Sequence, residues 1–307
     1  MTKRKSSKPK FDAAQAITDD LIRVIERGTL PWRKPWRGGG DATPLRHNGE
    51  AYQGVNNFLL SMKSAIRGFS SPYWMTYNQA REMDAQVRKG ETSSIVIYYG
   101  TKERDGAESD DGERSVYRFL KSYRVFNANQ IDGLDDQFNP VADDIDLGYP
   151  PCEPIPHMQA FFDAVGGNVS FTGRSAYYMP AVDKIYMPEI SLFENPPEFY
   201  GTWAHEYAHW TKARHRLNRS YGDSRFGNTA YAREEIVAEL TSHFLGQHLG
   251  FAAHTLEMSA AYLDSWLHVL KADKTAIFKH AADAQRAADY LIEASRKGSE
   301  QPVQIAA

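Results

Sequence analysis

The sequence predicts an α+β protein of two domains: a small mixed N-terminal domain and a mostly helical C-terminal domain with a short sheet. The length of 307 residues exceeds that of most single domains. The apolar and charged fractions, 42% and 24%, allow each half to bury a core. The long strand patterns end near residue 126, whereas helical patterns dominate beyond residue 195.

The first domain is expected over residues 11–126. Apolar residues at helical spacing predict three helices, over 11–27, 57–67 and 78–88. Two runs rich in β-branched and aromatic residues predict a pair of strands, over 94–99 and 116–126. The segment 103–114 between them is polar, acidic and glycine-containing, so we expect a mobile hairpin loop there.

A linker is expected over residues 127–156, which are rich in proline and acidic residues and show little periodicity. The second domain is then expected over 157–295. It should begin with a helix over 158–165 and three short strands, over 170–171, 176–179 and 184–187. Four helices should complete it, over 197–213, 232–249, 258–271 and 273–295.

Composition excludes several classes of protein. No stretch approaches the roughly 18 consecutive apolar residues of a membrane span, so no membrane contact is expected. The basic N-terminus has no apolar stretch after it and is not expected to be a secretory signal. Cys152 is the single cysteine, which excludes a disulfide within the chain and a cysteine-based zinc finger. A cytoplasmic protein is the expected class.

The charge is unevenly distributed along the chain. Residues 1–125 hold 22 Lys and Arg against 15 Asp and Glu, whereas the remainder holds 14 against 24. A basic half of this kind is expected to meet polyanions, although an ordinary solvated surface can show the same excess.

The most specific motif is His205-Glu206-Tyr207-Ala208-His209, in a segment expected to be helical. Residues four apart lie one above the other on a helix, so both imidazoles can reach one metal ion. Glu206 lies beside that position and can act as the general base toward a water on the metal. An amphipathic helix with solvated histidines is the alternative, which the acidic residues downstream make less favourable.

A catalytic zinc ion needs a third protein ligand and an open position for water. Glu235 and Glu239 lie four apart on a later helix, the spacing found in thermolysin-type gluzincins. That spacing predicts Glu235 as the ligand and Glu239 as the residue that fixes the tautomer of a ligand imidazole. Two alternatives stay open. Glu239 could itself be the ligand, or His215, which has the metzincin spacing but follows Lys212 where that class has a turn-making glycine.

Zinc is the expected cofactor, with manganese or another divalent metal as the alternative. Water at the open position would have a pKa of about 7 and would become a nucleophile suited to peptide-bond hydrolysis. A hydrogen-bond donor should also stabilise the oxyanion. Three side chains are candidates for it: Tyr221, Tyr231 and His243.

Aromatic and basic residues alternate along the first domain. Aromatic rings stack on unpaired bases while Lys and Arg follow the phosphates, so this composition predicts a surface for single-stranded DNA. The candidate contacts are Trp32, Arg33, Lys34, Trp36, Arg37, Arg46, Tyr52, Tyr73, Trp74 and Lys89. The alternative is that these aromatic residues pack in the core beneath a solvated basic face.

Motifs in both halves resemble the ArdC-type antirestriction proteins. The first half contains GTLPWRKPW (28–36), YQGVNN (52–57), SPYW (71–74), VRKG (87–90) and YRVFN (123–127). The second half contains HEYAHW (205–210), RLNR (216–219), YAREE (231–235), VAE (237–239) and SWLHVL (265–270). The resemblance spans nearly the whole chain, and it supports Glu235 as the third ligand.

The resemblance implies an N-terminal domain that binds single-stranded DNA, of the kind also found at the start of the plasmid primase TraC, and a zincin-like metallopeptidase domain. It implies a plasmid-borne protein that protects incoming conjugative DNA from host restriction, with host restriction proteins as candidate targets. Two other functions stay open. One is a regulatory peptidase recruited to DNA-bound proteins, and the other is a DNA-binding protein whose metal is purely structural.

Overall fold

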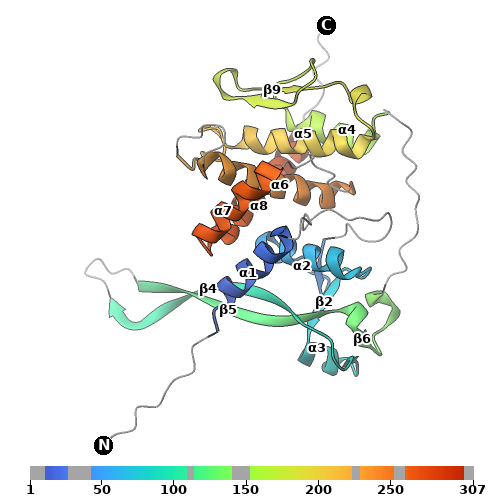
Figure 1. The fold of residues 1–307 in the computed structure, drawn as a ribbon, viewed down its shortest axis with the longest axis vertical. Helices are drawn as coiled ribbons and strands as arrows, with labels where there is room; N and C mark the ends of the chain where they lie inside the picture. Colours follow the sequence, from blue (N-terminus) through green and yellow to red (C-terminus); the bar gives the residue numbers. More distant parts are fainter. Residues whose placement is uncertain are drawn as a thin grey trace, which may run out of the picture.

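The computed structural model describes residues 11–26, 43–108, 114–139, 153–222, 229–251 and 260–300. A mixed four-stranded sheet with a long antiparallel hairpin lies at one end of the molecule, long helices form its middle, and a small three-stranded sheet lies near the other end (Figure 1). The α+β class predicted from the sequence is confirmed. None of the helices in the described ranges is both long and apolar enough to cross a membrane.

The N-terminal sheet has the strand order β1-β2-β5-β4. Its strands are β1 (Leu45–Arg46), β2 (Tyr73–Thr76), β4 (Ser94–Glu108) and β5 (Arg114–Asn127). The expectation of a mobile loop over 103–114 is wrong for most of that segment, because β4 continues to Glu108 and β5 starts at Arg114. An exposed antiparallel ladder needs only backbone hydrogen bonds, so polar side chains do not end it. Residues 109–113 lie outside the described part of the chain.

The first helices are α1 (Ala13–Glu26) and α2 (Gly54–Arg67), and α2 ends at Gly68, which has a φ of 68°. The third, α3 (Tyr77–Glu82), is shorter than the predicted helix over 78–88. Its Thr76 cap is a capping box with Gln79, but Asp84 takes a φ of 55° and ends helical geometry. The next residues form β3 (Gln86–Val87), which pairs antiparallel with β6 (Ile131–Asp132).

The segment expected to be a linker begins with ordered structure. After β5 come the 3₁₀ turn η1 (Ala128–Gln130), β6 and a second 3₁₀ turn, η2 (Asp136–Phe138). Ile131 and Phe138 are buried in a small apolar cluster with Met75 of β2, so this part packs against the N-terminal sheet. Residues 140–152 of the expected linker lie outside the described ranges.

The second half starts with α4 (Pro156–Val165) and a sheet of order β7-β9-β8. Its strands are β7 (Val169–Phe171), β8 (Tyr177–Met179) and β9 (Lys184–Met187), with 3₁₀ turns η3 (Pro180–Val182) and η4 (Ile190–Leu192). Strand β9 pairs parallel with β7 and antiparallel with β8. Four helices follow: α5 (Pro196–Thr211), α6 (Thr229–Leu249), α7 (Ala260–Ala272) and α8 (Ala276–Glu300).

The two halves share one hydrophobic core. Residues of α1, α2 and β4 are buried together with residues of α5 to α8, among them Ile17, Phe58, Ile97, Trp203, Ile236 and Leu291. Polar contacts join the same surfaces: Asn57 of α2 donates to Gln247 of α6 at 2.8 Å, and the Gly54 backbone donates to Gln285 of α8 at 2.9 Å. The N-terminal sheet is therefore held in a fixed position relative to the helices that carry the candidate site.

Candidate metal centre

Helix α5 holds its histidines in place through its cap and its aromatic face. The Asn195 side chain accepts a hydrogen bond from the Glu198 backbone N–H at 3.1 Å, and prolines occupy the first turn. Trp203 and Tyr207 pack on Phe162 of α4 in a nearly parallel stack. This packing fixes the rotation of the helix.

Helix α6 carries three buried acids. Glu234, Glu235 and Glu239 are 5%, 3% and 2% exposed, which is unusual for carboxylates. The Ser242 hydroxyl of α6 donates to the Gly201 carbonyl of α5 at 2.8 Å. This bond fixes how the two helices align lengthwise, and with it which acid faces which histidine.

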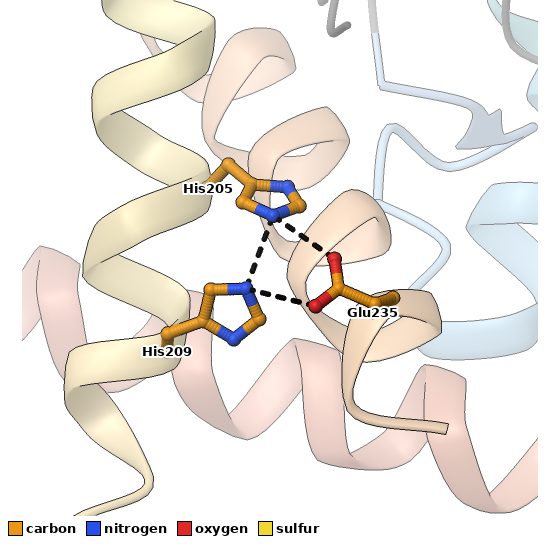
Figure 2. Close-up of side chains that lie close together, drawn as sticks. All are labelled: His205, His209 and Glu235. Carbon is orange, nitrogen blue, oxygen red and sulfur yellow. Dashed lines mark hydrogen bonds and ion pairs between the residues drawn. The ribbon is translucent and has the colours of Figure 1, made fainter. Parts of the chain in front are cut away.

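Three ligand atoms converge between these helices (Figure 2). The Nε2 atoms of His205 and His209 lie 3.1 Å apart. Glu235 Oε2 lies 3.3 Å from Nε2 of His205, and Glu235 Oε1 lies 3.5 Å from Nε2 of His209. Zinc bonds of 2.0–2.1 Å at tetrahedral angles separate ligand atoms by about 3.3 Å. The triangle therefore has the size that one such ion requires.

The other nitrogen of each imidazole faces a second carboxylate. His205 Nδ1 lies 3.4 Å from Glu239 Oε1, and His209 Nδ1 lies 3.3 Å from Glu234 Oε1. Such partners hold a ligand imidazole in the tautomer whose Nε2 can bind a metal. Glu239 was expected to orient an imidazole; the matching position of Glu234 was not foreseen. The only indication of this role in the sequence was that Glu234 directly precedes Glu235 in the YAREE motif.

Arg219 completes this arrangement from the loop after α5. It donates to both oxygens of Glu234, at 2.7 and 3.0 Å, and to the Ala208 carbonyl at 2.9 Å. Burial alone would raise the pKa of Glu234, but the hydrogen bonds from His209 and Arg219 outweigh it and lower the pKa to about 2. For His205, burial opposes protonation, yet Glu235 and Glu239 raise the pKa of its imidazole well above the ordinary value.

Glu206 lies next to this cluster and is 6% exposed. Its Oε2 atom is buried and has no hydrogen-bond partner among the described residues. A carboxylate in that state is costly unless a water, a substrate or a cation meets it. The three carboxylates of α6 lie around the two imidazoles, and the donor set of two nitrogens and one oxygen is one that binds zinc-like divalent cations.

The alternative third ligand, His215, does not join the group. Its side chain is 65% exposed and lies 3.3 Å from Asp183. Of the candidate oxyanion donors, Tyr221 gives its hydroxyl to Asp283 of α8 and packs edge-on against His280. Its burial and this bond raise the pKa of the Tyr221 phenol. Tyr231 and His243 both lie on α6.

The residues expected to contact DNA differ in their surroundings: some are exposed, some are buried, and some lie outside the described residues. Trp32, Arg33, Lys34, Trp36 and Arg37 lie outside the described residues. Arg46 is exposed and its guanidinium lies 5.2 Å above the centre of the Tyr52 ring, whereas Tyr52 and Trp74 are 8% and 0% exposed. Tyr73 packs edge-on against Phe138, and Lys89 is exposed in the turn after β3. Trp74 and Tyr52 are thus packed in the core, which was the alternative to stacking on DNA bases.

Each half of the chain matches a known protein family. Residues 11–126 match the family described as the N-terminal domain of anti-restriction factor ArdC, and residues 156–283 match a zincin-like metallopeptidase family. The protein y4eC of Sinorhizobium fredii is 34% identical over 299 residues, which cover 95% of each chain. DNA primase TraC of Escherichia coli is 32% identical over 315 residues; the match covers 94% of this chain and 20% of that protein.

Two solved structures of the antirestriction protein ArdC from plasmid R388 are similar over the whole chain, at 42% identity. The metal-free structure has a TM-score of 0.79 and the match covers 94% of this chain and 99% of that one. The Mn(II)-bound structure has a TM-score of 0.77, with 93% and 98% covered.

Proposed function

The chain belongs to the ArdC antirestriction family, and from this premise we propose that it protects incoming conjugative DNA from host restriction enzymes. The proposal has two parts, a surface for single-stranded DNA in the N-terminal half and a divalent metal centre in the zincin-like half. This role belongs in the cytoplasm, where restriction enzymes meet entering DNA. Host restriction proteins are the candidate targets of a peptidase activity.

The metal centre consists of His205, His209 and Glu235. The observation that carries it is the triangle of two Nε2 atoms and one carboxylate, all within 4.8 Å of one another and enclosed between two packed helices. The Mn(II)-bound structure of R388 ArdC supports the same site type in this chain. Zinc and manganese both suit the donors. When bound, the ion supplies Lewis acidity at a position left open by the three ligands.

The surrounding side chains have separate roles in peptide-bond hydrolysis. Glu234 holds the imidazole of His209 with Nδ1 as the donor, and Glu239 lies 3.4 Å from Nδ1 of His205, which leaves each Nε2 lone pair to be directed at Glu235. Glu206, with one oxygen unpartnered, accepts the proton of the attacking water at its Oε2 atom and returns it to the leaving amine.

Single-stranded DNA is the proposed ligand of the N-terminal half. The TraC relative that shares this chain's sequence is named a DNA primase, and residues 1–125 carry the chain's excess of Lys and Arg. Aromatic side chains stack on unpaired bases and basic side chains bind phosphates. Side chains of both kinds are exposed on the N-terminal sheet.

The test compares protection and metal binding in the same variants. Plasmid transfer into a restricting recipient is measured with the unchanged protein, Glu206→Ala and His205→Ala, while elemental analysis gives metal content. We expect Glu206→Ala to keep the metal and lose protection, and His205→Ala to lose both. Full protection by Glu206→Ala would show that the metal is structural and that no peptidase step is needed.

A further inference from the structure

The hairpin of β4 and β5 presents two different faces. Residues opposite each other in an antiparallel pair share a face, as do alternate residues of one strand. Val96 lies opposite Tyr123, Tyr98 opposite Lys121, and Gly100 opposite Phe119. These six residues therefore share one face of the hairpin, which we call the aromatic face.

Helices pack against part of the opposite face. Ile95 and Ile97 pack into the shared core with α1 and α2, and the Tyr99 ring lies edge-on to Phe278 of α8, with centroids 6.2 Å apart. Tyr99 nevertheless remains 55% exposed, and on the aromatic face Tyr98 and Tyr123 are 53% and 46% exposed. Two large exposed rings on one face of a strand pair form an apolar patch of the kind that binding surfaces use.

The aromatic face has a specific local construction. A Cβ atom on Gly100 would lie 2.3 Å from Phe119 Cζ, so the Phe119 ring lies directly on the Gly100 backbone. The Lys121 ammonium is 5.2 Å from the centre of that ring. Tyr98 is tilted by 49° toward the same ring at 6.2 Å. The absence of a side chain at Gly100 thus lets the Phe119 ring lie against the strand, beside the Tyr98 ring and the Lys121 ammonium.

The same face continues across the sheet to Arg46. Arg46 pairs with Trp74, and Trp74 is aligned with Asn127 of β5, two residues from Val125. Tyr52, Trp74, Val96 and Val125 form one buried cluster on this face together with Leu60 of α2, so α2 covers this part of it. The guanidinium of Arg46 lies over Tyr52. This covered part lies between the exposed rings of Tyr98 and Tyr123 and the guanidinium of Arg46.

Charge limits how far a nucleic acid can extend along the hairpin. Residues 94–100 and 119–127 contain Lys121 and Arg124 and no acidic residue. The outer part, 101–118, contains four Lys and Arg against six Asp and Glu. A phosphate chain is therefore favoured at the base of the hairpin and disfavoured along the outer parts of β4 and β5, which extend beyond the helices (Figure 1).

We propose that single-stranded DNA lies across the aromatic face, with bases stacked on Tyr98 and Tyr123 and phosphates at Lys121 and Arg46. This inference rests on the proposed single-strand binding and assigns the surface for it. Stacking on exposed rings needs unpaired bases, because a duplex keeps their faces covered.

The experiment measures binding of the full-length protein to a fluorescent oligothymidylate by anisotropy over a series of salt concentrations. Tyr98→Ala combined with Tyr123→Ala should weaken binding at least fivefold, the smallest effect of losing one stacked base, while leaving the salt dependence unchanged. Tyr98→Phe combined with Tyr123→Phe keeps both rings and should retain the affinity. Melting temperatures of all variants show whether they are folded.

Lys121→Ala and Arg124→Ala form a matched pair, because they remove one cation from opposite faces of the same strand. Arg124 lies over Phe11 on the helix side. Lys121→Ala should reduce the slope of log affinity against log salt by about 0.7, and Arg124→Ala should reduce it by less. Equal effects of the two would overturn the assigned face.

The outcomes separate this inference from the proposed function. If the unchanged protein binds the oligothymidylate and the double alanine variant binds equally well, the aromatic face is the wrong surface while single-strand binding stands. If the unchanged protein does not bind, both proposals fall. Equal binding of a duplex, weakened equally by the alanine variant, would contradict stacking.

Discussion

His209 Nδ1 lies 3.3 Å from Glu234 Oε1, and Arg219 holds that carboxylate through two hydrogen bonds. The side chains of Glu234 and Arg219 are 7% and 6% exposed, so solvent screens this pair little. An ionised Glu234 requires Nδ1 of His209 to be the donor, and the lone pair of Nε2 then faces Glu235. The contacts from Arg219 to Glu234 and from Glu234 to His209 thereby determine which nitrogen of His209 is free to bind a cation.

Glu234→Gln should weaken metal affinity about 10- to 100-fold, because an amide has one acceptor oxygen and cannot accept all three hydrogen bonds that Arg219 and His209 give the carboxylate. Titration against a competing zinc chelator measures this. Glu293→Gln serves as the control, since Glu293 is an exposed acid of α8 paired with Arg296. An unchanged affinity in a folded Glu234→Gln protein would mean that Glu234 does not position His209.

The sequence predicted part of this centre and could not have predicted the rest. His205, Glu206 and His209 follow from one helical turn, and Glu235 from its spacing to Glu239. Neighbouring residues of a helix point about 100° apart, so only the crossing of α5 and α6 decides that Glu234 meets His209. The ligand roles stay proposals, whereas the convergence of the side chains is a property of the fold.

Local patterns failed where pairing with a distant segment decided the structure. The helix expected over 78–88 ends at Glu82, because Gln86 and Val87 pair with Ile131 and Asp132. Trp74 sits in an aromatic, basic sequence that fits DNA binding as well as core packing. Its burial follows from the alignment of β2 with β5, which sequence patterns do not report.

Metal should stabilise the folded protein through the same three side chains. At a free metal concentration about 100 times the Kd, binding to the native state alone adds about 2.7 kcal/mol to the free energy of unfolding. Glu235→Gln should abolish most of the rise in melting temperature that zinc or manganese produces, and a chelator should reverse that rise in the unchanged protein. A full metal-dependent rise in folded Glu235→Gln would exclude Glu235 as a ligand.

His280 should make stability fall at mildly acidic pH. Burial lowers the pKa of its imidazole to about 4, from an ordinary value of 6.5. Between these values the unfolded chain binds a proton that the folded chain does not, so the free energy of unfolding falls as the pH drops from about 6.5 to 4. The loss between pH 7 and pH 5 should be about 2 kcal/mol.

Urea unfolding of His280→Gln and the unchanged protein, both with chelator present, isolates this contribution, because other titrating groups are common to the two. The unchanged protein should lose about 2 kcal/mol more than the variant between pH 7 and pH 5. Parallel pH profiles would show that His280 is not held neutral in the folded state.

Trp74→Ala distinguishes core packing from base stacking. The ring is fully buried and lies edge-on to Phe69, with centroids 5.7 Å apart. Its removal should lower the free energy of unfolding by about 3–5 kcal/mol, whereas Tyr98→Ala, which removes an exposed ring from the same sheet, should change it by less than about 1 kcal/mol. Urea unfolding of both variants measures the difference. A Trp74→Ala protein of normal stability with weakened DNA binding would show that this ring leaves the core to meet a base.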